Sequence, residues 1–109
     1  MPEMKVVLDS VSGPTLSAVT TNATGTAVDG IQPRSTATVV AVGTGTLAGT
    51  LTIEGSLDNS AWVSTGTTVA LTAAATVSAT STGKAFRYYR TSLSGASGTG
   101  SCTATMAAV

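Results

Sequence analysis

The stretch Thr50-Leu51-Thr52-Ile53-Glu54-Gly55-Ser56-Leu57 has the clearest structural pattern in this chain. Leu51, Ile53 and Leu57 alternate with polar residues, and a period of two is typical of a strand with one buried face. Gly55 interrupts the apolar set, which indicates a bulge or the close approach of another segment. The stretch therefore predicts a half-buried β-strand.

The segments on both sides of this stretch share its β character. Threonine and valine dominate them, and β-branched side chains suit a pleated surface. Good helix formers other than alanine are scarce, so helices are not expected. Further strands are predicted at residues 26–29, 36–42, 62–65, 68–72, 76–80, 85–93 and 101–108, the last with Cys102, Ala104, Met106 and Ala108 on one face.

Short runs of Gly, Asn, Asp and Ser separate these segments, and such residues favour turns. About eight short strands at this spacing predict an all-β fold, a single antiparallel β-sandwich of jelly-roll or immunoglobulin-like type. We assign residues 25–109 to the sandwich. Residues 1–24, which Ser12-Gly13-Pro14 interrupts, are predicted to be an extended N-terminal arm, and deletion of residues 2–20 should leave the sandwich folded.

The composition narrows the possible functions. Charged residues make up 9% of the 109 residues and the formal net charge is zero, so nothing steers the chain toward nucleic acid or an anionic membrane. A protein with a net charge near zero resists self-association poorly, which favours a working state in an assembly. The start has no apolar signal segment and no run is long enough to span a bilayer, so synthesis in a cytoplasm is expected.

The residues needed for catalysis are scarce. The chain has no histidine, which rules out a Ser-His-Asp triad and histidine ligands for a metal. One cysteine, Cys102, is too few for a thiolate zinc site, and its place in a strand-like run suggests a small buried residue. Glu54 and Asp58 would lie about 13 Å apart on a strand, too far for a glycosidase pair. We expect no enzyme activity and no cofactor or metal.

The large side chains gather in two segments, Ser56-Leu57-Asp58-Asn59-Ser60-Ala61-Trp62 and Phe86-Arg87-Tyr88-Tyr89-Arg90. Asp58 and Asn59 suit a turn that delivers Trp62 either into the end of the sandwich or to its surface. Arg90, if buried, needs Glu54 or Asp58 as a partner. In the alternative interpretation, Trp62 and Tyr89 form an exposed aromatic platform for a sugar or a partner protein.

The same two segments resemble the "GS-x-D-G-x-x-W … RYVR" pattern of small virion sandwiches of tailed phages and, more weakly, of discoidin-type galactose-binding-like jelly rolls. Asn59 stands where that pattern often has Gly. The phage resemblance implies a capsid decoration, or cement, protein on the outer surface of the virion. Its partners would be the major capsid protein and further copies of itself, as a trimer first or a dimer second.

The resemblance also suggests where the coat protein would be contacted. The arm would supply the contact, together with loops at one end of the sandwich. The alternatives are a tail or head-fibre module that binds host glycans, and a tail or baseplate structural subunit. Within the arm, the candidate partner-binding residues are Met4, Lys5, Val6, Val7 and Leu8.

Overall fold

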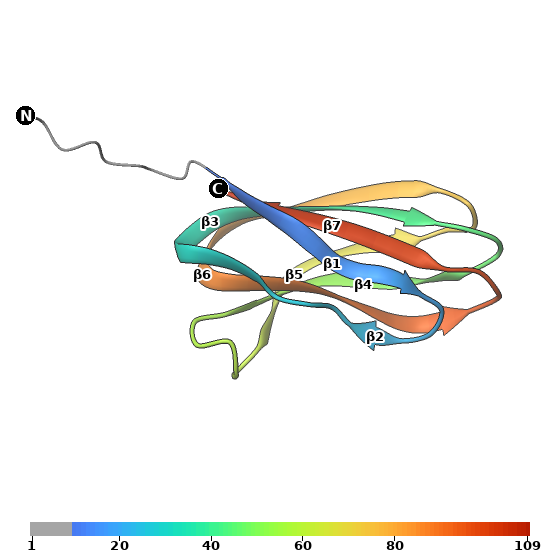
Figure 1. Ribbon diagram of the computed structural model, residues 1–109, viewed down its shortest axis with the longest axis horizontal. Coiled ribbons are helices and arrows are strands. Elements are labelled where there is room, and N and C mark those ends of the chain that lie inside the picture. The colour runs from blue at the N-terminus through green and yellow to red at the C-terminus, as the bar shows by residue number, and fades with distance from the viewer. Residues whose placement is uncertain (1–9) are drawn as a thin grey trace, which may run out of the picture.

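The computed structural model describes residues 10–109, and this part of the chain is built from β-strands joined by turns (Figure 1). The predicted all-β class is confirmed. The strands are fewer than the eight expected, and two of them are long. They are β1 (Val11–Val19), β2 (Ala23–Thr24), β3 (Val28–Gly43), β4 (Ala48–Ser56), β5 (Val63–Leu71), β6 (Thr76–Ser97) and β7 (Cys102–Ala108).

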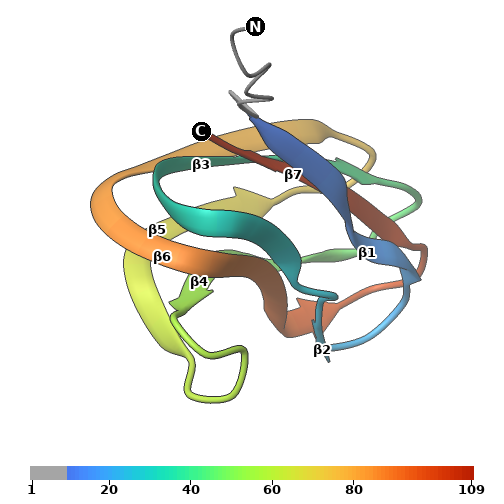
Figure 2. The same cartoon turned by 60° about the vertical axis from the view of Figure 1, so that its left-hand side comes forward.

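All seven strands belong to one antiparallel hydrogen-bonded sheet with the order β1-β7-β3-β6-β4-β5, and β2 pairs with β6. This sheet folds over itself because β3 and β6 each run from one layer into the other (Figure 2). We call the layer formed by β1, β7, residues 36–43 of β3 and residues 76–82 of β6 the first layer. The second layer contains β4, β5 and residues 86–97 of β6, with β2 and the start of β3 alongside.

The passage between layers explains why the predicted strands were too short. Gly83, at a φ of +76°, lies where β6 leaves the first layer, so the predicted segments 76–80 and 85–93 form one bent strand instead of two. The pairing of β3 with β6 shifts register twice, between Asp29 and Arg34 and again before Thr36. Irregularities of this kind let a strand turn the corner of a sandwich.

The two layers contribute side chains of different size to the core. From the first layer, β7 buries Cys102, Ala104, Met106 and Ala108, which confirms the predicted alternation of this strand. Together with Ala37, Val39 and Ala41 of β3, these side chains are mostly small. The second layer supplies most of the larger buried side chains, namely Leu51, Ile53, Leu71, Tyr89 and Leu93.

The end of β4 differs in part from the prediction. Leu57 does not share the buried face: it is 66% exposed, because the strand ends at Ser56 and the Asp58 turn begins there. Gly55 confirms the expected close approach, since a Cβ atom at this position would run into the ring of Phe86. The β4–β5 pairing also shifts register between Thr52 and Glu54.

The predicted boundary between arm and sandwich at residue 24 is wrong. Val11–Val19 pairs with β7, and Leu16 is only 2% exposed within the core. Thr15 binds the second layer, accepting hydrogen bonds from the N–H of Thr26 at its carbonyl and from the N–H of Thr91 at its hydroxyl. The Ser-Gly-Pro sequence was misleading because an edge strand tolerates proline. Deletion of residues 2–20 would therefore remove part of the core.

Candidate functional site

Charge is distributed very unevenly over the described residues 10–109. The segments that form the first layer, residues 11–19, 36–43, 76–82 and 102–108, contain no charged side chain. The charged side chains of the described part lie in the second layer, in the turns beside it, or where β3 and β6 pass between layers. They are Asp29, Arg34, Glu54, Asp58, Lys84, Arg87 and Arg90.

The outer surface of the first layer is a regular array of small side chains. The strand registers place Ser12, Ala107, Thr38 and Thr80 in one row across β1, β7, β3 and β6. The next row consists of Pro14, Thr105, Val40 and Ser78. We call this surface the hydroxyl face; it consists of Ser12, Pro14, Thr36, Thr38, Val40, Val42, Thr76, Ser78, Thr80, Thr82, Thr103, Thr105 and Ala107.

Two features make the hydroxyl face suitable for packing against another surface. The hydroxyl oxygens of Thr38 and Thr80 lie 3.0 Å apart and bond to each other, which satisfies part of their polarity locally. Val40 and Val42 are 45% and 46% exposed among them. The exposed apolar side chains and the lack of charge lower the cost of removing water from this face, because no charged side chain needs to be desolvated.

The surface of the second layer around Arg90 is charged and aromatic, in contrast to the hydroxyl face. The guanidinium Nε of Arg90 donates to Glu54 Oε1 at 2.8 Å, and its Cζ lies 4.1 Å from the centroid of the Trp62 ring. The expected carboxylate partner of Arg90 is therefore Glu54. Trp62 is half-buried beside this ion pair, directly before β5 begins.

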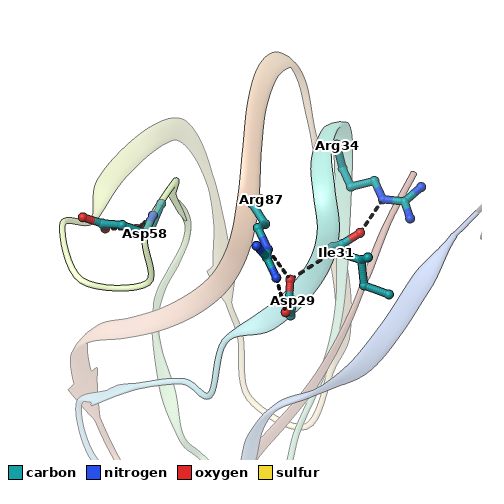
Figure 3. Close-up of polar contacts among 7 residues, drawn as sticks. Asp29, Ile31, Arg34, Asp58 and Arg87 are labelled. Carbon is teal, nitrogen blue, oxygen red and sulfur yellow. Dashed lines mark hydrogen bonds and ion pairs between the residues drawn. The ribbon is translucent and has the colours of Figure 1, made fainter.

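A second ion pair involves Arg87, which precedes Arg90 on β6. Arg87 donates to both carboxylate oxygens of Asp29, at 2.9 and 3.2 Å, and its Cζ lies 5.0 Å from the Tyr88 ring centroid (Figure 3). The Arg87 bonds, followed by the backbone N–H of Ile31, hold the pKa of Asp29 below its usual value. We call Asp29, Glu54, Trp62, Arg87, Tyr88 and Arg90 the aromatic–ionic cluster.

The strand segment beside the cluster has an unusual backbone. Ile31 has a φ of +71°, which is rare for a β-branched residue, and its side chain is exposed. Two bonds hold this conformation: Ile31 N–H donates to Asp29 Oδ1 at 2.7 Å, and Arg34 Nε donates to the Gly30 carbonyl at 2.9 Å (Figure 3). The Asp29 carboxylate thus binds Arg87 and also stabilises the bend of β3 at Ile31.

The turn between β4 and β5 follows the prediction for Asp58 and Asn59. One oxygen of Asp58 accepts the N–H groups of Ala61 and Ser60, both at 2.9 Å, and the hydroxyl of Ser56 at 3.0 Å. These bonds lower the pKa of Asp58 in that order of importance. Asn59 takes the left-handed conformation, with a φ of +61°. Asp58 is therefore committed to shaping the turn.

The candidate platform residues do not form one surface. Tyr89 is 1% exposed and packs edge-on against Phe86, with ring centroids 5.9 Å apart. Its hydroxyl lies 2.5 Å from the Arg34 carbonyl and 3.1 Å from the Lys84 carbonyl, so Tyr89 is a core residue. Trp62 is half-buried at the surface of the second layer, where its ring packs against Arg90. The other candidates, Met4, Lys5, Val6, Val7 and Leu8, lie outside the described residues.

The sequence did not reveal the roles of three residues of the candidate surfaces, Asp29, Val40 and Val42. Asp29 looked isolated because its partner Arg87 is 58 positions away in the chain. Val40 and Val42 lie in the predicted strand 36–42, and the structure shows that their side chains are exposed. The alternation of Ala37, Val39 and Ala41 with Thr38, Val40 and Val42 could have revealed one open face.

The described residues offer little for chemistry at a reaction centre. Among residues 10–109 no group of three or more Cys, Asp and Glu side chains is arranged to hold a metal ion. Cys102 is buried, and burial raises the pKa of its thiol, which disfavours the reactive thiolate. The same residues contain no helix that is long and apolar enough to cross a membrane.

Comparison with known proteins gives one likeness in fold. No protein-family model matches the chain, and no curated protein matches it. Among solved structures, the chain is similar to one titled "Crystal structure of PirA", with a TM-score of 0.53 and 15% sequence identity. The match covers 98% of this chain and 100% of that one. At this identity the likeness concerns the fold alone.

Proposed function

We propose that this protein is a non-enzymatic structural protein of a tailed-phage virion that decorates the outer capsid and clamps neighbouring major capsid subunits. The observation that carries the proposal is the hydroxyl face, an ordered surface of the first layer without a charged side chain. A protein whose partner is a fixed protein surface needs shape and hydrogen bonds more than long-range charge.

The strands behind the hydroxyl face suit such a role. Their inward side chains are buried or partly buried, and the core cluster includes Ala37, Val39, Ala104 and Met106 from these strands. The face is therefore built on a packed sheet and presents its side chains at fixed spacing, which lowers the entropy lost on binding. In this proposal the hydroxyl face takes over the coat contact that the sequence assigned to residues 1–24.

The direct test is where the protein sits and how many copies are present. Phage particles produced with the gene carrying a small epitope tag would be labelled with gold-conjugated antibody and imaged, and copies per particle would be counted by quantitative mass spectrometry. Label distributed over the head at many copies supports decoration. A few copies confined to the tail would contradict it and favour a tail or baseplate subunit.

A host-glycan module is the second candidate, and the aromatic–ionic cluster favours it. Trp62 and Tyr88 lie beside side chains with several hydrogen-bond donors and acceptors, which is the composition of many ligand sites. Glycan-array binding that is lost in Trp62→Ala and kept in Val40→Ala would favour this function. The absence of specific glycan binding by the unchanged protein would remove it.

A further inference from the structure

The two-layered sheet has three long strands that are paired on one side only within residues 10–109. They are β1, β5 and the first part of β6, residues 76–82. The unpaired side of such a strand presents backbone N–H and C=O groups that accept another strand, and proteins usually protect it with proline, charge or a bulge. The three strands differ in whether they have this protection.

Two of the three edges are protected. Pro14 interrupts β1, and the β1–β7 pairing shifts register on both sides of Leu16. In β5, Gly66 has a φ of +84°, and the pairing with β4 shifts register close to it. Neither strand presents a straight ladder to another chain.

Residues 76–82 of β6 have no such protection. Their sequence, Thr-Val-Ser-Ala-Thr-Ser-Thr, contains no charge, proline or glycine. The opposite side of the segment pairs with β3 in unbroken register, from Thr36–Thr82 to Val42–Thr76. The edge is thus straight over seven residues, a length close to that of a typical complete strand. We call it the first-layer edge.

We propose that the first-layer edge pairs antiparallel with the same edge of a second copy, about a two-fold axis at Ala79. An antiparallel pair of identical strands is self-complementary and closes as a dimer. Side chains alternate along the edge: Thr76, Ser78, Thr80 and Thr82 face outward, whereas Val77, Ala79 and Ser81 face the core side. A shift of the pairing between the two copies by one residue would place outward-facing side chains opposite core-facing ones. Only registers that avoid this keep Val77, Ala79 and Ser81 of both copies on the core side.

Of the permitted registers, the one centred on Ala79 pairs all seven residues. It places Thr76 opposite the partner's Thr82 and Ser78 opposite the partner's Thr80. The first charge beyond the edge, Lys84, would lie opposite the partner's Ala74, so no like charges meet. The two hydroxyl faces would then join into one continuous uncharged surface. This argument favours a dimer over the trimer expected first, and it holds whether or not the protein decorates a capsid.

A cysteine scan tests the register. In an antiparallel pair the Cα atoms of directly opposed residues lie about 4.5–5.5 Å apart, within the range that a disulfide bridges. Ala79→Cys should therefore form a covalent dimer under mild oxidation. Val77→Cys is the matched control: its two copies would be offset by four residues, or roughly 13 Å along the strand. The unchanged protein, in which Cys102 is buried, gives the background level of cross-linking.

Sedimentation velocity over a concentration series tests the association itself. The unchanged protein should dimerise reversibly, and Ala79→Lys should be monomeric with an unchanged circular dichroism spectrum, because it places a charge on the pairing edge. Thr105→Lys, in the middle of the hydroxyl face, should still dimerise.

Three results would overturn the proposal: an unchanged protein that stays monomeric throughout the series, equal cross-linking of Val77→Cys and Ala79→Cys, or dimers lost on deletion of residues 2–9. The last result would assign the contact to the N-terminal segment.

Discussion

The two layers of this small protein divide its properties between them. The first layer contains mostly small side chains on its inner side and no charge on its outer side. The second layer contributes most of the bulky core residues and carries the aromatic–ionic cluster. In our proposal the first layer supplies the interaction surface, whereas the second layer supplies most of the large buried side chains. The comparison suggests that stability and interaction reside in different layers.

The largest effect should come from the second-layer core. Leu51→Ala should lower the free energy of unfolding by about 2–5 kcal/mol, because Leu51 is fully buried and the change leaves a cavity. Urea denaturation followed by tryptophan fluorescence measures this change. The first-layer variant Val42→Ala, on the hydroxyl face, should cost less than about 1 kcal/mol, since this side chain is exposed. Equal losses would contradict the burial of Leu51 in the core and the exposure of Val42 on the hydroxyl face.

The next effect concerns the hydroxyl of Tyr89. Tyr89→Phe should destabilise the protein by about 1–3 kcal/mol, because buried backbone groups of Arg34 and Phe86 lose their partner. Thermal denaturation monitored by circular dichroism gives the difference. Tyr88→Phe, at the half-buried neighbouring position, is the control and should be close to neutral. A neutral Tyr89→Phe would show that the hydroxyl does not hold β3 against β6.

A smaller effect is expected at the Arg90–Glu54 pair. Both side chains are partly exposed, so Glu54→Gln should cost about 0.5–1 kcal/mol. The loss should shrink at high salt, where ions screen the attraction. Urea midpoints at low and high salt test this expectation. A loss that is the same at both salt concentrations would mean that packing against Trp62 dominates over charge.

The smallest effect is the pH dependence that Asp29 and Asp58 contribute. The folded state lowers the pKa of Asp29 and Asp58 from 3.8, so their stabilising effect is complete above 3.8 and is lost as the pH falls through the lowered values. Carboxyl NMR titration should show both midpoints below 3.8. Asp58→Asn should raise the exchange rates of the Ser60 and Ala61 amides, whereas Ser92→Ala should not. A midpoint at or above 3.8 for Asp58 would contradict its hydrogen bonds in the turn. The same result for Asp29 would contradict its bonds with Arg87.

The fold class was predictable because its signals are local. Alternation in residues 50–56 and 102–108 follows from strand geometry, and the Asp58 turn follows from side-chain chemistry that acts within three residues. The length of β6 was not predictable from the same rules. The predicted strands 76–80 and 85–93 lie on either side of Gly83, but a glycine serves equally well as a bend inside a strand that changes layers.

The candidate surfaces depended on long-range pairing and were harder to predict. The hydroxyl face joins four strands that are distant in sequence, and only their registers show that Thr38, Thr80 and Thr105 share one side. Tyr89 and Tyr88 are adjacent in the sequence, yet only the pairing of β6 with β3 and β4 decides which one is buried. The assignment of residues 11–19 to an N-terminal arm was wrong because β7, at the other end of the chain, is the partner of β1.

One matched pair of variants tests most directly whether the hydroxyl face is the interaction surface. Thr105→Lys places a charge at the middle of this face, and Thr50→Lys places the same charge on the exposed side of β4 in the second layer. Binding to particles that lack the protein would be measured by co-sedimentation. Thr105→Lys should weaken binding more than about tenfold, since burying an unpaired charge costs several kcal/mol and about 1.4 kcal/mol corresponds to a factor of ten. Thr50→Lys should bind normally, and the reverse pattern would contradict the account.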